Sequence, residues 1–201
     1  MLQVLFVRHG ESEANRENRI MSWRGDPALT ERGYREAKIL AEAWSDYRIS
    51  AVYASPLKRT MDTAAAFTCP GQQVIADGRL HEIALGRWDG KIIADIEAED
   101  GDRYRQWKQD PELGAPDGGE ALSAVARRLH EFLTDIVGAY GDDELVVAVT
   151  HSDCLKALLL SVLGAPWQSA QWIHWANTAG YLLEWRNQHW QFLAQPIVPV
   201  R

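Results

Sequence analysis

The sequence predicts an α/β fold, a three-layer sandwich in which helices cover both faces of a mostly parallel central sheet. Short apolar runs rich in β-branched residues alternate along the chain with longer segments of helical periodicity, which is the pattern of a parallel sheet wrapped by helices. No fixed repeat, low-complexity segment or clear linker divides the 201 residues. We therefore expect one domain over residues 1–201, long enough to bury a core without disulfides or a structural metal.

The first elements are a strand, a helix and a second strand. The apolar run Leu2–Val7 is the first predicted strand. The segment from Thr30 to Trp44 is predicted as a helix with Thr30 as its N-cap, because apolar residues recur on one face at helical spacing. Ile49–Ala54 is the second predicted strand.

A helix, a short strand and an irregular insertion follow. Proline is favoured in the first turn of a helix, so Pro56 is predicted to begin a helix that runs toward Phe67. Val74–Ile75 is the third predicted strand. Residues 82–120 are charged and contain several glycines and prolines. They are predicted to form an insertion of short helices and loops over the C-terminal edge of the sheet, where it makes part of a cleft.

The last third of the chain returns to regular elements. Helices are predicted over Glu120–Ala139 and Cys154–Leu163, with the strand Glu144–Val149 between them. Tyr181–Trp185 and Trp190–Leu193 are predicted as the two arms of a hairpin. Tryptophans crowd this region, and packing in the core or in an interface is the expected reason.

Composition excludes several classes of function. The net charge of -7 argues against a bulk electrostatic grip on nucleic acid or on an anionic membrane. Only Cys69 and Cys154 occur, so a disulfide framework is not expected and a cytoplasmic location is favoured. Neither a signal peptide nor an apolar run long enough to cross a membrane is recognisable.

Unusual polar residues follow two of the predicted strands. The first strand runs into Arg8-His9-Gly10, and the strand that ends at Val149 runs into Thr150-His151-Ser152. Ligands of open parallel sheets bind outside the carboxyl ends of the strands, so the two histidines are expected to face one cleft. Arg59, just beyond the end of the second strand, reaches the same edge.

Two arginines, two histidines and a glycine suit a multiply charged oxyanion. The guanidinium fork matches phosphate oxygens, and fixed positive charge stabilises a phosphoryl group in transfer. A neutral imidazole beside bound phosphate can attack phosphorus and form a phosphohistidine that water hydrolyses. Glu82 offers a carboxyl group that burial can keep protonated for the leaving alcohol.

Six blocks of residues stand in order along most of the chain, and together they are specific where one Arg-His-Gly tripeptide is not. The blocks are Arg8-His9-Gly10-Glu11-Ser12 with Asn15, Leu29-Thr30-x-x-Gly33, Ser55-Pro56-Leu57-x-Arg59-x-x-x-Thr63-Ala64, Glu82 with Gly86-x-Trp88-x-Gly90, Gly118-Gly119-Glu120, and Val149-Thr150-His151. In this order they resemble the histidine phosphatase superfamily, the phosphoglycerate-mutase-like group.

The resemblance implies roles for individual residues. His9 would be the phosphorylated nucleophile, with Arg8, Arg59 and His151 around the phosphate. Glu82 would give a proton to the leaving group and then act as the base that activates water.

Further contacts are implied as well. Asn15 and the backbone amide of Ser152 would each bind the phosphate. The family commonly has glycine where Ser152 stands, so its β-carbon is expected to narrow the pocket. The resemblance implies no metal and no cofactor.

Other interpretations of these residues stay open in the sequence. Glu11 and Glu120 compete with Glu82 for the role of acid. His151 and Cys154 have metal-like spacing, but no second pair accompanies them, so Cys154 is expected to be a buried helix residue.

Three tryptophans are candidates for contact with the organic part of a substrate. Trp23 lies in the loop after the first motif, and Trp88 and Trp107 lie in the insertion. All three are expected at the mouth of the cleft.

The reaction predicted is hydrolysis of a small phosphorylated metabolite by a metal-independent phosphomonoesterase. Phosphoglycerate mutases of this group usually carry Arg-His-Tyr-Gly after the acid, whereas residues 82–90 here are similar to the phosphatase branch. A cofactor-dependent phosphoglycerate mutase is the alternative, and an inactive phosphate-binding module is a third possibility. The expected partner is a small-molecule phosphate ester, with neither nucleic acid nor membrane, and a homodimer is left open.

Overall fold

The predicted strands form a six-stranded sheet in the order β3-β2-β4-β1-β5-β6. The structure, a computed structural model, describes residues 1–193, so the end of the predicted domain at residue 201 lies outside the described residues. The strands are β1 (Gln3–Arg8), β2 (Ile49–Ala54), β3 (Val74–Ala76), β4 (Leu145–Thr150), β5 (Gly180–Arg186) and β6 (His189–Leu193).

The sheet is mostly parallel, as predicted. β1 and β2 each pair in parallel with β4, and β3 pairs in parallel with β2. β5 joins β1 in the antiparallel sense, and β6 completes the predicted hairpin. Asn187 and Gln188 form its two-residue turn, and both have the positive φ that a tight hairpin turn needs.

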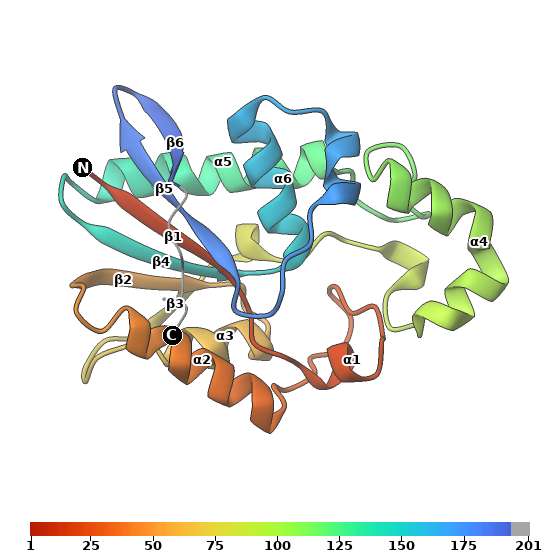
Figure 1. The fold of residues 1–201 in the computed structure, drawn as a ribbon, viewed down its shortest axis with the longest axis horizontal. Coiled ribbons are helices and arrows are strands. Elements are labelled where there is room, and N and C mark those ends of the chain that lie inside the picture. The colour runs from red at the N-terminus through yellow and green to blue at the C-terminus, as the bar shows by residue number, and fades with distance from the viewer. Residues whose placement is uncertain (194–201) are drawn as a thin grey trace.

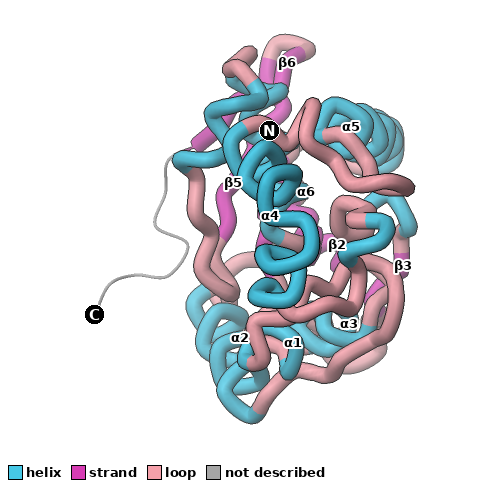
Figure 2. The backbone as a smooth tube through the Cα atoms, turned by 90° about the vertical axis from the view of Figure 1, so that its right-hand side faces the viewer, coloured by secondary structure: helices cyan, strands magenta, loops and turns pink. Residues whose placement is uncertain are grey.

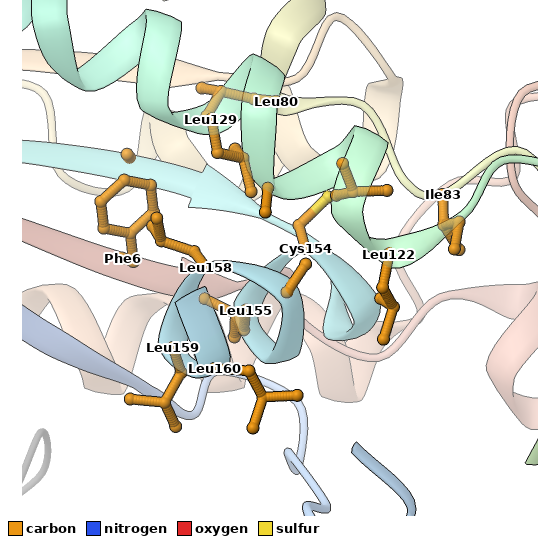
Figure 3. Close-up of a cluster of buried hydrophobic side chains, with 14 of the residues drawn as sticks. Phe6, Leu80, Ile83, Leu122, Leu129, Cys154, Leu155, Leu158, Leu159 and Leu160 are labelled. Atoms are coloured by element: carbon orange, nitrogen blue, oxygen red, sulfur yellow. The ribbon is translucent and has the colours of Figure 1, made fainter. Parts of the chain in front are cut away.

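Helices cover both faces of the sheet and complete the predicted sandwich (Figure 1). α2 (Glu31–Ala43) and α3 (Lys58–Ala65) pack on one face, where Leu40, Val52 and Val149 belong to the same buried cluster. α5 (Leu122–Ala139) and α6 (Ser152–Leu163) pack on the other face. Figure 3 shows part of this second core, where Cys154 lies among leucines of both helices and is buried as expected.

The predicted insertion lies beyond the carboxyl ends of the parallel strands. Its main element is α4 (Ile93–Gln109), which is kinked at Asp100, and η1 (Gly78–Leu80) and η2 (Gly86–Trp88) are short 3-10 turns. Figure 2, viewed from this end, shows α4 in front of the sheet with α1 (Glu13–Arg16) below it. α1 was not predicted from the sequence, because a single helical turn has no detectable periodicity.

Two predicted helix starts are wrong. Pro56 does not begin α3, which starts at Lys58 with Leu57 as N-cap, because the side chain of Asp26 accepts a hydrogen bond from the Lys58 amide at 2.6 Å. α6 begins at Ser152 rather than Cys154, directly after the strand. The N-cap Thr30 is confirmed, since its side chain accepts from the amide of Gly33.

The tryptophans of the C-terminal third mostly pack, as predicted. Four of them lie half-buried against the core of the α5–α6 face: Trp167, Trp175, Trp185 and Trp190. Trp172, in the 3-10 segment η3 (Trp167–Trp172), is instead 82% exposed. Among residues 1–193, no helix combines the length and the apolar character that a bilayer crossing requires.

Two glycines fix how the loop after β1 meets α2. A β-carbon on Gly33 would lie 2.1 Å from the carbonyl oxygen of Glu11, and one on Gly10 would lie 2.5 Å from the carbonyl oxygen of Gly33. Thr30 strengthens the contact, because its amide and its hydroxyl both donate to Glu11. The loop that carries His9 is therefore pressed directly onto the first turn of α2.

We predict that Gly33→Ala destabilises the protein by about 1–3 kcal/mol, because the added methyl group overlaps backbone atoms that have little room to move. Urea unfolding measures the difference. Gly138→Ala is the control, since Gly138 lies in α5 with nothing within 4 Å of its β-position, and it should stabilise by about 0.4–1 kcal/mol. Equal effects of the two variants would contradict the close approach.

Candidate active site

The register of the central strands brings His9 and His151 together. Arg8 at the end of β1 lies opposite Thr150 at the end of β4, so the next residue of each strand leaves the sheet at the same level. The amide of His9 still donates to the carbonyl of Thr150 at 3.1 Å. The two imidazole rings lie with their centroids 5.2 Å apart, and both side chains are buried.

His9 is held in one tautomer. Its Nδ1 lies 2.7 Å from the carbonyl oxygen of Gly10, which only accepts hydrogen bonds, so Nδ1 carries the proton and Nε2 keeps its lone pair. Burial lowers the pKa of His9 well below its ordinary value, and the positive charges of Arg59 and Arg8 lower it further. The ring is therefore neutral at physiological pH and presents an unprotonated Nε2.

His151 is held in a tautomer suited to donation. Its Nδ1 lies 3.4 Å from a guanidinium nitrogen of Arg59, which can only donate, so Nδ1 accepts and the ring proton is on Nε2. That Nε2 is buried and has no partner among residues 1–193. Burial, with the nearby charge of Arg59, lowers the pKa of His151 well below its ordinary value, so the neutral ring offers a single N–H donor.

Arg8 and Arg59 also bury donors without partners. Nε of Arg8 and Nη1 of Arg59 make no hydrogen bond within the described chain, and Arg59 is only 2% exposed. Burial lowers the pKa of both guanidinium groups, and the charge of Glu82 opposes this effect most strongly. Unpartnered donors in a dry site are costly, so the arrangement fits an anion that supplies the missing acceptors.

Asn15 and Ser152 lie on the wall of the same cavity. The side-chain oxygen of Asn15 accepts from the amide of Ser12 and from Nδ2 of Asn177, which leaves the amide group of Asn15 for a ligand. Ser152 is the first residue of α6, where backbone N–H groups have no partner inside the helix and favour a negative charge.

Glu82 has the properties of a proton donor. Burial raises its pKa to about 7, and the charge of Asp153 adds to the effect. Its side chain lines the cavity together with His9 and Arg59, and one carboxyl oxygen accepts from the amide of Ile83 at 3.0 Å. Near neutral pH, a large fraction of this carboxyl group therefore holds its proton.

Two side chains hold the backbone of Glu82, and the sequence did not single out one of them, Arg128. The carbonyl of Glu82 accepts from Nε1 of Trp23 at 2.7 Å and from Arg128 at 3.3 Å. Arg128 also forms a two-pronged ion pair with Glu120, at 3.0 and 3.1 Å. Trp23 stacks on His81, with ring centroids 5.0 Å apart. A single arginine in a helix carries no sequence signal for such a role.

The competing acids are engaged elsewhere. Glu120 is paired with Arg128, and its backbone and side chain bond the segment at Ala84, so Gly118-Gly119-Glu120 shapes the loop after Glu82. Glu11 lines the cavity but accepts from Thr30 and Arg32. The side chain of Glu82 has no such ion pair in the described chain, and burial raises its pKa.

Of the three tryptophans predicted to contact the substrate, one is buried, one lines the cavity and one lies outside its lining. Trp88 was expected to touch substrate, and this is wrong: it is 1% exposed and its Nε1 donates to Asp100 at the kink of α4. Trp107 does line the cavity. Trp23 is 52% exposed but lies against Glu82 and His81, outside the lining of the main cavity.

A cavity of about 590 Å³ is lined by Arg8, His9, Arg59 and Glu82. Its walls come from the loop after β1, the start of α6, and the residues of α4 that face the sheet, including Tyr104 and Trp107. Within residues 1–193, no cluster of three or more His, Cys, Asp or Glu side chains has the arrangement of a metal site.

Comparison with known proteins gives the family. A sequence model of the histidine phosphatase superfamily (branch 1) matches residues 4–196. Phosphoserine phosphatase 1 of Hydrogenobacter thermophilus is 32% identical over 182 residues, which are 90% of this chain and 85% of that protein. Glucosyl-3-phosphoglycerate phosphatase of Mycolicibacterium vanbaalenii is 34% identical, over 82% of this chain and 75% of its own. Relatives named phosphoglycerate mutase are also found.

Solved structures agree with the sequence relatives. YhfR of Bacillus stearothermophilus superimposes with a TM-score of 0.88 and 29% identity, over 96% of this chain and 95% of that one. A mycobacterial glucosyl-3-phosphoglycerate phosphatase in complex with VO3 follows with 0.86 and 28% identity, over 94% and 96%. The fold, the paired histidines and these matches together make the chain a member of the histidine phosphatase superfamily.

We predict that the cluster of unpartnered donors binds inorganic phosphate and that Arg59→Met weakens this binding by about 10- to 100-fold, the loss expected for a charged hydrogen bond. Isothermal titration calorimetry measures the affinity. Arg105→Met is the matched control, because Arg105 is 68% exposed and pairs only with Asp102 on the surface of α4. Unchanged affinity in Arg59→Met would rule out the anion site.

Proposed function

We propose that the protein hydrolyses phosphate monoesters of small metabolites through a phosphohistidine at His9. The observation that carries this proposal is the unprotonated Nε2 of His9 amid buried donors that have no acceptor. A site made only to hold phosphate needs the donors but has no use for a neutral, correctly oriented nucleophile among them.

In the first step, Nε2 of His9 forms a bond to phosphorus while the bond from phosphorus to the ester oxygen breaks. Arg8, Arg59 and the Nε2–H of His151 stabilise the charge on the oxygens of the phosphoryl group in transfer. Protonated Glu82 gives its proton to the departing oxygen, so that the product leaves as a neutral alcohol.

In the second step, the Glu82 carboxylate takes a proton from a water molecule as its oxygen attacks the phosphohistidine. The bond between His9 and phosphorus breaks, inorganic phosphate forms, and both His9 and Glu82 return to their starting protonation states. Asn15 and the amide of Ser152 would hold phosphate oxygens in both steps.

Hydrolysis is favoured over transfer to a second organic acceptor. Relatives named as phosphatases support it, whereas relatives named as mutases support the alternative of a phosphoglycerate mutase. Labelling His9 with 2,3-bisphosphoglycerate and following the label separates them, because a phosphatase releases it as inorganic phosphate and a mutase passes it to monophosphoglycerate. Metal independence, a cytoplasmic location, and a homodimer stay predictions.

We predict that His9→Ala abolishes phosphate release from p-nitrophenyl phosphate in EDTA, whereas the unsubstituted protein stays active in the chelator. Removing a covalent nucleophile typically costs several orders of magnitude in kcat, up to about 10⁶-fold. His189→Ala is the control, since His189 is the exposed first residue of β6. Activity that persists in His9→Ala would remove the nucleophile assignment.

We predict that kcat falls as pH rises through about 7, because Glu82 then loses the proton that the leaving group needs. Asp153 raises the pKa of Glu82, so Asp153→Asn should lower that pKa and move the alkaline limb to lower pH. All pH–rate profiles are measured on one alkyl phosphate. The ionisation of the substrate is then the same for every variant, and a difference between profiles reports on the protein. Asp142→Asn, on an 86% exposed side chain, should leave the limb in place. A limb unmoved by Asp153→Asn would contradict the assignment of the acid.

A further inference from the structure

The cavity does not end at the catalytic groups. A second hollow of about 130 Å³ shares five of its lining residues with the main cavity, so the two hollows adjoin one another. The shared residues are Trp107, Lys108, Asp153, Lys156 and His174. They lie between the last turn of α4, the start of α6 and the segment after η3. A substrate with its phosphate at His9 would extend its alcohol part toward this side hollow.

Lys156 lines both hollows. It lies one helical turn after Ser152 on α6, its side chain is 17% exposed, and Nζ pairs with Asp153 at 2.8 Å. An ammonium group has three donors, so this pair leaves two for a ligand. The charges of Glu82 and Arg8 act on Lys156, which means that it lies within electrostatic reach of the reacting groups.

Lys108 adds a charge that nothing in the described chain neutralises. No carboxylate of residues 1–193 lies within ion-pair distance of it, and its ammonium group lies 5.8 Å from the ring centroid of Trp107. The neighbouring His174 is exposed and lines both hollows.

The pairing of the cations along the cavity leaves one cation at the side hollow without a carboxylate partner in the described chain. Arg32 pairs with Glu11 and Glu36, Arg19 pairs with Glu17, and Lys156 pairs with Asp153. The lining cations that remain without a carboxylate partner in residues 1–193 are Arg8, Arg59 and Lys108. A phosphate dianion carries two negative charges, which balance the charges of the two arginines when Glu82 is protonated and therefore neutral. Lys108 is then left over, at the side hollow.

The type of cation indicates which anion fits. A second phosphate group would be expected to meet the planar fork of arginine, and no arginine lines the side hollow within the described chain. A dianion there would also face Asp153. A carboxylate carries a single charge, which suits the free donors of Lys156 and the unpaired Lys108.

We propose that Lys156 and Lys108 form a carboxylate-binding subsite, so that the substrates are phosphate monoesters whose alcohol carries a carboxylate. This inference rests on the proposed hydrolase function and specifies the organic part of the substrate, which the phosphate chemistry leaves open. His174 forms the outer wall of the subsite.

Two pairs of esters that differ in the carboxylate test the proposal. 3-Phosphoglycerate is compared with glycerol 3-phosphate, and phosphoserine with phosphoethanolamine, by kcat/KM. The carboxylate ester of each pair should be preferred by about tenfold or more, the effect of one charged hydrogen bond. Preference within either pair supports the subsite, whereas equal kcat/KM within both pairs overturns it.

Variants connect the preference to the residues. In Lys108→Met the ratio of kcat/KM for 3-phosphoglycerate to that for glycerol 3-phosphate should fall to about threefold or less, mainly through KM. Lys156→Met should do the same, but Lys108, being exposed, provides the variant that is safe for folding. Lys38→Met, on a 77% exposed side chain of α2, is the matched control and should keep the wild-type ratio. An unchanged ratio in Lys108→Met and Lys156→Met overturns the assignment.

The assay also distinguishes a failure of the subsite from a failure of the hydrolase function. p-Nitrophenyl phosphate has no carboxylate and reports on the phosphate chemistry alone. If it is hydrolysed while the carboxylate esters show no preference, the subsite is wrong and the hydrolase function stands. If no ester releases phosphate, the hydrolase function fails and the subsite fails with it.

Discussion

The parallel pairing of β1 with β4 is the constraint on which the site depends. Since Arg8 and Thr150 are opposite one another, the residues after them leave adjacent strands side by side, and two imidazoles from distant parts of the chain meet. A shift of one residue in this register would turn one of the two rings to the opposite face of the sheet. The closely packed junction of the loop after β1 with α2 keeps the first ring from moving.

Burial and nearby charge together determine which groups around this pair of histidines are protonated. Burial alone disfavours every charged group there, yet the outcome differs by residue. The histidines give up their protons and stay neutral, the arginines keep their charge, and the buried carboxyl of Glu82 holds its proton near neutral pH. One environment thus yields a nucleophile, a set of cationic donors and an acid, because their ordinary pKa values start from different points.

The sequence predicted what depends on local pattern and missed what depends on distant contacts. The parallel strands, the Thr30 cap, the hairpin and the paired histidines follow from periodicity and from residues at strand ends. The predicted start of α3 was wrong because the amide of its first residue, Lys58, donates to the side chain of Asp26, which lies far away in the sequence. Arg128 looks like any polar residue of an amphipathic helix until its contacts with Glu82 and Glu120 are seen. Trp88 lies in a stretch whose sequence is typical of a loop. Its side chain nevertheless lies in the core, where it donates a hydrogen bond to Asp100.

The two ends of the cavity are built from different parts of the chain, and this has an evolutionary consequence. In the proposed mechanism phosphate is bound by residues at the edge of the sheet, whereas much of the wall around the alcohol would come from α4 and the segment after η3. Mutations in the latter can accumulate without disturbing the register that sets the histidines. Proteins with this fold can therefore change their substrate through mutations in α4 and in the segment after η3, while descendants inherit the residues at the sheet edge unchanged.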